Sequence, residues 1–496
     1  MLAFTKAVVR IADNIGVPFL TFNGWISIWL FFYAVTAAFF DLTRVVRLAT
    51  RFTDEIFAFL IVSIFVFDAV GDPFSDVGIL RYFDPNHPSH EEAMEENPDD
   101  DYNYMEVALL STILGFGTTA LIFTFRMIKD TAFFCNDGIR GSFHDFAVTL
   151  AVLSMTVVKE FLFSNVSTEQ LDVPNKFEPT FQCCTEACDT FFPDECPDQP
   201  EAYGSRDWFV DFSNLNGKGY VPILAAGPAI LAFLLCFLDN GITWHLINHP
   251  NNNVQHGEAY NYDLCLSGLF NCINGCLGLP WLVATTVPCI IHLNSLAEKD
   301  KQGRIIHVQE TRLTMLLSHL MVGLSLLVLE ILQLLPMPVL YGVFLFMGLS
   351  ALPAMQFWNR LLLWFQQPSK YPDFVFTRYM EKKKIHLYTV IQLLFFGLVF
   401  MVQNTAAISI VFPLMTLLCI PGRLFLLPRF FEGWELCLMD GDDLEIDEWV
   451  KRKRMAMRTL SSDNLALYAP EDEESPIIDT SENVAEDDDA PMIEDA

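Results

Sequence analysis

The chain has 496 residues, 52% of them hydrophobic, with 45 phenylalanines and a formal net charge of −31. Such an apolar composition excludes an ordinary soluble domain and indicates a membrane protein with several spanning segments. The acidic residues are expected in loops and the tail, because one charged side chain at the centre of a membrane helix costs about 2.5–3.5 kcal/mol.

Apolar runs long enough to cross a bilayer, which takes about 20 residues, recur after a short amphipathic piece over residues 1–16. Thr53 or Asp54 is the expected N-cap of the second run, and residues 403–405 are expected to form a tight turn between the last two. The predicted spans cover residues 20–40, 52–70, 106–126, 145–163, 221–247, 260–278, 280–297, 311–333, 336–354, 386–403 and 404–425.

The hydrophilic connections differ in charge, and this difference predicts the side on which each lies. Basic residues gather at 44–51, 126–140, 299–304, 382–384 and 451–454. The positive-inside rule places these connections and the C-terminus in the cytoplasm. The acidic connection over residues 71–105 then lies outside, as does the one over residues 164–220.

The outer connection at 164–220 carries four closely spaced cysteines: Cys183, Cys184, Cys188 and Cys196. Such a cluster forms either a zinc site or disulfides. Disulfides are favoured outside the cell, where the environment is oxidising, and their pairing stays open. Asn165 begins an Asn-Val-Ser sequon in the same connection, so it is a candidate for glycosylation.

Asp239 lies inside the apolar run at 221–247. An ionisable residue at membrane depth predicts a functional site, because a stranded charge there is costly. The alternative is a carboxylate satisfied by backbone N–H groups or a neighbouring hydroxyl. Thr243 follows one helical turn later and shares the same face.

The stretch from Leu277 to Leu296 is apolar but interrupted by Gly278, Pro280 and Pro288, with Thr285 and Thr286 in its middle. Broken backbone survives at membrane depth only where protein buries it or where it lines a wet cavity. Transporters use such half-helices to bind ions with their N-terminal ends. The alternative is a Pro-kinked packing helix.

Six motifs, spread in order over roughly residues 1–445, share one resemblance. They are FTDEIFAFLI at 52–61, FLDNGIT at 237–243, GLPW with ATTV over 278–287, HLNSL at 292–296, PVLYGVFLFMG at 338–348 and HLYT at 386–389. They resemble the bicarbonate transporter superfamily, solute carrier family four, which contains the red-cell anion exchanger and the sodium bicarbonate cotransporters.

The resemblance implies an all-α polytopic membrane protein with an inverted-repeat transporter fold, in which a core domain that holds the substrate moves against a gate domain. The family has fourteen spans, of which about 11 complete ones are expected here. Residues 1–4 resemble the middle of the family's third helix, so the soluble N-terminal domain and the first two and a half helices are expected to be lacking. Either an internal methionine has been taken as the start, or the chain is truncated.

The same comparison predicts the domain organisation. Residues 1–70 are expected to hold a remnant of the core domain and the first gate helix. The other expected regions are an acidic extracellular loop (71–105), gate helices (106–163), the cysteine-containing extracellular loop (164–220), core helices with the broken helix (221–333), gate helices (334–430) and an acidic cytoplasmic tail (431–496).

The resemblance also places Asp239 and Thr243 beside the broken helix, at a site formed by Ala284, Thr285, Thr286 and Val287. The sodium cotransporters likewise carry Asp there, whereas the anion exchangers have Glu and a partnering Arg where this chain has Pro288. A carbonate or bicarbonate ion near Asp239 would be repelled, and a helix terminus opposes this with only about half a charge. Bound Na⁺, held by the oxygens of Asp239 and Thr243 and by backbone carbonyls near residues 284–287, would reverse that balance.

The predicted function is therefore secondary active transport of bicarbonate or carbonate coupled to Na⁺, in a protein of the plasma membrane. A chloride/bicarbonate exchanger, a borate transporter and a non-transporting truncated membrane protein remain alternatives. Relatives form homodimers, and Asp440 to Asp443 resemble an acidic motif for recruiting carbonic anhydrase, although a solvated acidic run is the alternative. No resident cofactor, nucleic-acid partner or enzymatic activity is expected, since no nucleophile–base pair, phosphate loop or metal motif is recognised.

Overall fold

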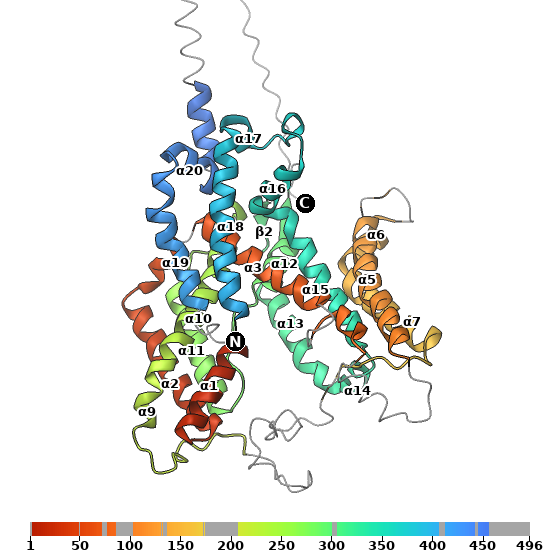
Figure 1. Ribbon diagram of the computed structural model, residues 1–496, viewed down its shortest axis with the longest axis vertical. Coiled ribbons are helices and arrows are strands. Elements are labelled where there is room, and N and C mark those ends of the chain that lie inside the picture. The colour runs from red at the N-terminus through yellow and green to blue at the C-terminus, as the bar shows by residue number, and fades with distance from the viewer. Residues whose placement is uncertain are drawn as a thin grey trace, which may run out of the picture. The chain divides into compact units, whose positions relative to one another are not determined.

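The computed structural model describes residues 2–48, 50–71, 77–85, 103–129, 131, 136–171, 173, 207–299, 305–405, 412–441 and 445–455. These residues are largely helical (Figure 1), with one short antiparallel hairpin made of β1 (Ala297–Lys299) and β2 (Ile305–Val308). The predicted all-α class is confirmed. Residues up to Asp442 form one compact unit, and residues from Asp443 form a second unit in which 445–455 are helical.

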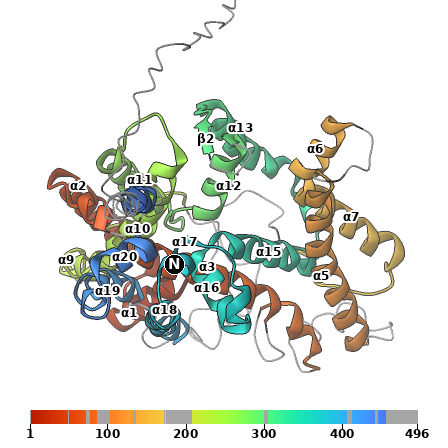
Figure 2. The ribbon, with the colours of Figure 1, turned by 90° about the horizontal axis from the view of Figure 1, so that it is seen from above.

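One set of helices packs around α2 (Phe19–Phe39), and we call it the first helix group. Its other members are α1 (Leu2–Ile15), α9 (Val221–Leu224), α10 (Ala226–Ile247), α11 (Tyr260–Cys276) and α12 (Thr286–Leu296). A buried cluster of small and large apolar residues from α1, α2 and α10 fills its centre. Figures 1 and 2 both show α2, α10 and α11 side by side.

Small residues set the close approach of α2 and α11. A Cβ atom added at Gly275 would lie 2.1 Å from the Ser27 hydroxyl oxygen, and one added at Gly268 would lie 2.6 Å from the Ala34 Cβ atom. Close backbone approach at small residues is a main source of helix association in membranes. Larger side chains at Gly268 or Gly275 would therefore push α2 and α11 apart.

A second helix group includes α3 (Arg51–Val70), which packs against some of its members. It comprises α5 (Tyr104–Ile128), α6 (Asp137–Asp145), α7 (Ala147–Leu162), α15 (Met337–Ala351), α16 (Gln356–Leu362) and α18 (Lys382–Asn404). At the contact of α5 with α15, a Cβ atom added at Gly342 would lie 2.3 Å from the Gly115 carbonyl oxygen. Arg360, 0% exposed, donates to the Glu55 carboxylate at 2.8 Å.

Helix α19 (Phe412–Phe425) contacts α10 of the first helix group and both α3 and α18 of the second. The remaining α-helices are α13 (Arg312–Leu324), α14 (Leu329–Leu332), α17 (Val375–Tyr379) and α20 (Gly433–Asp440). The 3₁₀ segments are η1 (Leu42–Leu48), η2 (Ile79–Phe83), η4 (Pro250–Asn252), η5 (Ser325–Val328), η6 (Leu352–Ala354), η7 (Leu363–Phe365), η8 (Pro368–Lys370) and η10 (Leu427–Arg429).

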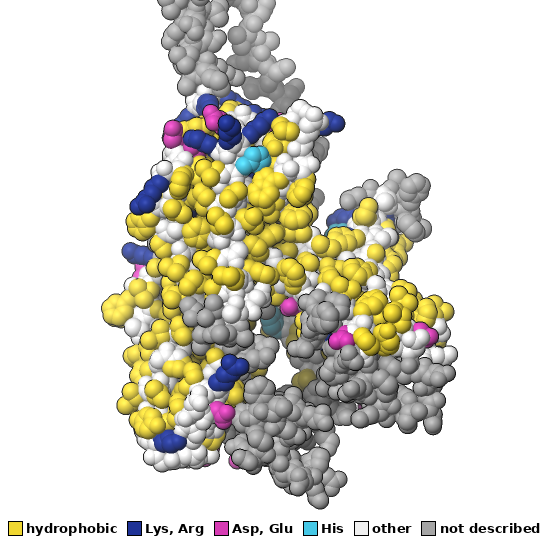
Figure 3. Space-filling model, viewed as in Figure 1, with side chains coloured by type: hydrophobic (Ala, Val, Ile, Leu, Met, Phe, Trp, Pro, Cys, Tyr) yellow, Lys and Arg dark blue, Asp and Glu magenta, His cyan; other side chains and the backbone are white. Residues whose placement is uncertain are grey.

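Five helical segments among the described residues are long and apolar enough to cross a membrane: Phe19–Phe39, Tyr104–Ile128, Val221–Ile247, Arg312–Leu332 and Lys382–Asn404. A sixth is possible if Met337–Ala351 and Gln356–Phe365, which are bent by 83°, count as one span. Figure 3 shows a broad hydrophobic face over α18 and α19, with Lys and Arg gathered near α17 and α20. These features support a multi-pass membrane protein, while the expected count of 11 spans stays a prediction.

Three details of the predicted elements were wrong. Helix α3 begins at Arg51 with Thr50 as its N-cap, because the Thr53 hydroxyl bonds the Thr50 backbone and a carboxylate far along the chain, that of Asp440, accepts from the Phe52 N–H at 2.6 Å. Only Thr286–Leu296 of the span predicted at 280–297 is helical. Residues 403 and 404 belong to α18 rather than to a tight turn.

The predicted tail boundary at 431 also differs from the packing. Helix α20 lies inside the first compact unit, with Leu438, Met439 and Asp440 buried. Glu435 in the same helix pairs with Lys384 at 2.6 Å. The apolar residues of α20 explain why this stretch folds, although it lies beyond the last predicted span.

Candidate functional site

The predicted broken helix is present. Helix α11 ends at Cys276, residues 277–285 are non-helical, and α12 starts at Thr286. Gly278 has φ +66°, a left-handed conformation that glycine adopts without strain. The first N–H groups of α12 have no partner within the helix and form its positive end. This end lies against α10.

Four of the six predicted site residues meet at this helix end. The hydroxyl oxygens of Thr243 and Thr286 lie 2.6 Å apart, and both side chains are buried. The Thr243 hydroxyl also donates to the Asp239 carbonyl oxygen at 3.0 Å. The backbone N–H of Ala284 lies near the Asp239 carboxylate. The predicted convergence of α10 with the broken segment is therefore present in the structure.

The other two predicted residues do not join this contact. The Thr285 side chain is exposed, and its hydroxyl oxygen lies 3.6 Å from the Cys289 sulfur. The side chain of Val287 is outside the described part of the structure. Pro288, which is exposed, occupies the first turn of α12, where its missing N–H costs no helical hydrogen bond.

The start of α1 also touches the broken segment. The Phe4 and Trp281 rings lie 5.3 Å apart between centroids, and both side chains are buried. Trp281 additionally donates its ring N–H to the Ser27 hydroxyl of α2 at 2.6 Å. The buried Trp281 thus anchors the segment to α1 and α2, while residues 279, 280, 282, 283 and 285 are exposed.

The far end of α12 leads directly into the β1–β2 hairpin, which is tied to the loop after α10. Asn253 donates to the Ile305 carbonyl at 2.6 Å, and Glu310 accepts from His256. Although partial burial opposes the Glu310 charge, hydrogen bonds from His256 and from the backbone N–H of Gln255 hold the pKa of Glu310 below its usual value. This anchor fixes α12 from its C-terminal side.

A contact between a histidine and a carboxylate joins the two helix groups near the C-terminal end of α10. His245 Nε2 lies 3.3 Å from the Asp54 Oδ2 atom of α3. The pair lies two residues beyond Thr243 along α10, so a displacement of one helix group against the other would stretch it.

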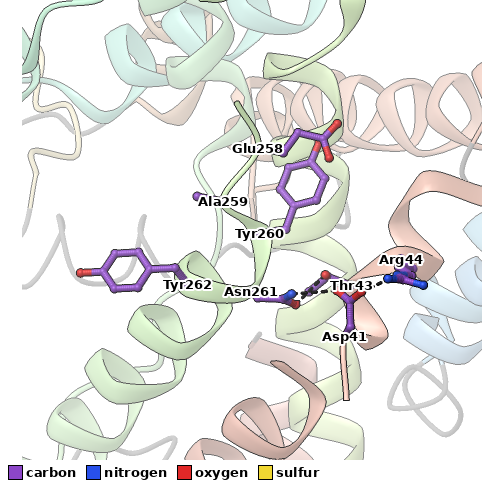
Figure 4. A pocket seen from close by; sticks show the side chains of 8 residues that line it. All are labelled: Asp41, Thr43, Arg44, Glu258, Ala259, Tyr260, Asn261 and Tyr262. Atoms are coloured by element: carbon purple, nitrogen blue, oxygen red, sulfur yellow. Dashed lines mark hydrogen bonds and ion pairs between the residues drawn. The ribbon is translucent and has the colours of Figure 1, made fainter. Parts of the chain in front are cut away.

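A separate polar pocket of about 270 Å³ lies where α2 ends and α11 begins. Its side chains bind one another (Figure 4): Asn261 donates to Asp41 at 2.7 Å and accepts from Thr43 at 2.7 Å, and Arg44 pairs with Asp41. None of the predicted site residues lines it. The pocket is therefore distinct from the candidate ion site.

The remaining predicted residues are distributed as follows. The four clustered cysteines lie outside the described residues. Asn165 is exposed just after α7, which leaves the sequon accessible. Asp440 is buried and accepts from Arg423 at 2.6 Å. It is therefore no part of a solvated acidic run, while Asp442 and Asp443 lie outside the described residues.

Sequence reasoning missed two residues of α11, Asn271 and Asn274, which hydrogen-bond the backbone of the broken segment. Their signal was present in the sequence, because two amides spaced three residues apart lie on one face of a stretch, residues 268–276, that is otherwise apolar. Polar residues of this kind in membrane helices commonly bond across helices or to backbone groups.

Comparison with known proteins gives a consistent result. A family model described as "HCO3- transporter integral membrane domain" matches residues 1–97, 84–186 and 194–444. Band 3 anion transport protein from Rattus norvegicus is 29% identical over 456 residues, which is 90% of this chain and 46% of that protein. Anion exchange protein 2 from Mus musculus is 30% identical over 481 residues, covering 90% of this chain and 36% of that protein.

The chain thus spans less than half the length of these curated relatives. Among solved structures, the transmembrane domain of the cyanobacterial bicarbonate transporter BicA is similar over 80% of each chain. Its TM-score is 0.38 and its sequence identity 14%.

Proposed function

The chain belongs to the family of HCO3- transporter integral membrane domains, and from this premise we propose that it transports bicarbonate or carbonate by secondary active transport coupled to Na⁺. The observation that carries the proposal is the meeting of Asp239 and Thr243 with the N-terminal end of α12. Such a helix end at a break in the membrane attracts an anion. The negative charge of the nearby Asp239 carboxylate opposes the binding of that anion, so a second ion of positive charge is needed.

Electrostatic magnitudes favour a cation partner. Two like unit charges about 4 Å apart repel by roughly 4 kcal/mol at an effective dielectric constant of about 20. The N-terminal end of a helix carries about half a positive charge, so at the same distance its attraction offsets only about half of this repulsion. A carbonate ion beside ionised Asp239 is therefore disfavoured unless a bound cation offsets the carboxylate.

The residues at the site fit Na⁺ by the chemistry of their donors. A hard cation prefers oxygen ligands, and Asp239, Thr243 and Thr286 offer carboxylate and hydroxyl oxygens. The Asp239 carboxylate has about four acceptor positions, and the backbone N–H of Ala284 lies near it. The carboxylate can therefore accept that N–H and ligate a cation at the same time.

We further propose that the two helix groups are the moving parts. The first helix group, which holds the broken segment, corresponds to the core domain, and the second corresponds to the gate domain. The separate interiors of the two groups support this division. Contacts such as His245 with Asp54 and α10 with α19 would change as the core moves.

Other assignments extend the same proposal. The basic connections and the C-terminus face the cytoplasm of a plasma-membrane protein, and the cysteine-containing loop lies outside, with disulfides and a glycan on Asn165. The protein forms a homodimer by analogy with its relatives. Burial of Asp440 argues against its direct use in recruiting carbonic anhydrase.

One observation favours a second function, chloride/bicarbonate exchange. The printed names of the relatives are those of anion exchange proteins. An exchanger needs no Na⁺, so the two functions differ in one measurable property.

The test is bicarbonate flux into proteoliposomes that contain the purified protein. Na⁺-coupled transport predicts that replacing Na⁺ by a large organic cation abolishes uptake, whether or not chloride is present. Undiminished uptake that requires chloride on the opposite side would reject Na⁺ coupling and establish exchange. Absence of flux under all conditions would reject transport by this chain.

A further inference from the structure

The non-helical segment before α12 needs partners for its backbone, because water does not supply them at membrane depth. Asn271 of α11, 0% exposed, provides two of them at one residue. Its side-chain oxygen accepts from the Leu282 N–H at 2.5 Å, and its side-chain nitrogen donates to the Leu282 carbonyl at 3.2 Å. The amide thus bonds both polar groups of one residue, as the neighbouring strand of a sheet would.

Leu282 is two residues from Ala284, whose N–H lies near the Asp239 carboxylate, and four from Thr286. An extended chain covers at most about 3.6 Å per residue, so a fixed Leu282 confines the Ala284 N–H to within about 7 Å of it. The second amide, Asn274, bonds the Pro280 carbonyl at 3.1 Å and steadies the start of the segment.

From this geometry we infer that Asn271 is a positioning residue of the ion site, which sets the place of the Ala284 N–H and of the α12 end relative to Asp239. The inference rests on the proposed function for its transport readout. It assigns the amide a role in ion affinity rather than only in holding the fold. Asn271 itself lies on α11 and bonds the segment, not the ion.

The test compares Asn271→Leu, which removes both hydrogen bonds at similar size, with Thr119→Val as the matched control. Thr119 also makes a buried hydrogen bond between helices, to the Gly342 carbonyl at 2.8 Å, but does so in the second helix group. Amide hydrogen exchange of residues 277–285 is measured on the purified full chain. Apparent KM and maximal rate for bicarbonate and Na⁺ are measured in proteoliposomes.

For Asn271→Leu we expect faster amide hydrogen exchange at Leu282 and Ala284, because two buried hydrogen bonds are lost. We also expect the apparent KM for bicarbonate and for Na⁺ to rise about tenfold. The maximal rate per folded molecule is expected to change by less than about twofold. Thr119→Val should change neither the exchange of this segment nor KM.

Asn271→Asp gives a rescue experiment and a second variant if Asn271→Leu does not fold. A protonated carboxyl group has one donor and acceptor capacity, as the amide does here, whereas an ionised one only accepts. The ratio of its KM to that of the parent chain should therefore fall as pH is lowered. If Asn271 had a purely structural role, the substitution would lower the amount of folded protein, and the KM ratio would not depend on pH.

Two results in Asn271→Leu would overturn the inference. One is unchanged amide hydrogen exchange of residues 277–285. The other is faster hydrogen exchange with an unchanged KM for both bicarbonate and Na⁺. Failure of the proposed function looks different. In that case the parent chain carries no bicarbonate with or without Na⁺, and the exchange measurement still decides whether Asn271 holds the segment.

Discussion

The two helix groups use their buried polar side chains in different ways. In the second, Arg360 and Glu55 pair side chain to side chain, and Gln392 joins them while bonding the Phe52 carbonyl. In the first, the buried Asn271 and the partly exposed Asn274 bond the backbone of a broken segment. One arrangement fastens regular helices to each other. The other holds irregular backbone whose N–H groups face a candidate ion site.

Because of this difference, we expect stability and transport to respond to different substitutions. Changes in the second helix group should lower the amount of folded protein and leave the ion affinities of the surviving molecules unaltered. Changes around the broken segment should alter ion affinities at nearly constant folded amount.

Arg360→Ala should have the largest effect, on stability. Removing one partner of a buried ion pair costs about 3–5 kcal/mol, because the other charge is left buried. We expect a strong loss of folded protein in membrane extracts, with unchanged KM for whatever survives. Arg378→Ala is the control, since its exposed pair with Asp373 should contribute little to stability. Equal losses in both variants would contradict the assignment.

Asp239→Asn should strongly reduce transport without reducing folded protein. The neutral amide keeps the size of the side chain but no longer attracts Na⁺, so we expect at least about a tenfold loss of Na⁺-dependent flux, equal to roughly 1.4 kcal/mol. Flux and folded amount are measured in the same preparation. Asp211→Asn, an exposed carboxylate outside the site, should behave as the parent chain. Full activity of Asp239→Asn would remove this carboxylate from the mechanism.

Glycine-to-alanine substitutions add the same methyl group to each of the two helix groups. Gly342→Ala places a methyl group against the Gly115 carbonyl, and such overpacking typically costs about 1–3 kcal/mol. Gly275→Ala displaces the Ser27 hydroxyl, which holds Trp281 of the broken segment, so we expect an altered KM as well. Thermal unfolding and flux are compared with Gly397→Ala, where no neighbouring atom interferes. The account fails here if Gly342→Ala alone changes KM.

Thr286→Val should give the smallest effect. It removes one neutral hydrogen bond, to Thr243, and one oxygen ligand, and a loss of about 1 kcal/mol corresponds to roughly a fivefold higher KM for Na⁺. Thr124→Val, an exposed threonine of α5, is the control and should leave this KM unchanged. A KM change for chloride rather than Na⁺ in Thr286→Val would support exchange instead.

Much of the fold followed from hydrophobic runs, because membrane helices are local features of about 20 residues. The meeting of Asp239 and Thr243 with the α12 end was predicted from the family resemblance together with the spacing on α10. Two features escaped prediction. The N-cap of α3 depends on Asp440, 388 positions away, and no local pattern reports so distant a partner.

The second feature was the pairing of Asn271 with Leu282, which needs only a chain reversal within eleven residues. The pairing was missed because an irregular segment has no regular repeat of apolar residues, and such a repeat is what predicts which side of a helix or strand contacts its neighbours. The sequence located the break at Gly278 and Pro280, yet not the hydrogen bonds that satisfy it. Irregular backbone in a membrane therefore predicts buried amides on adjacent helices, which can be sought deliberately.

The central claim is that Na⁺ and bicarbonate move together through a site that contains Asp239. Uptake of radioactive sodium into proteoliposomes, driven by an inward bicarbonate gradient, tests it most directly. The account predicts bicarbonate-dependent sodium uptake by the parent chain and its loss in Asp239→Asn. Bicarbonate flux without any sodium uptake by the parent chain would contradict it.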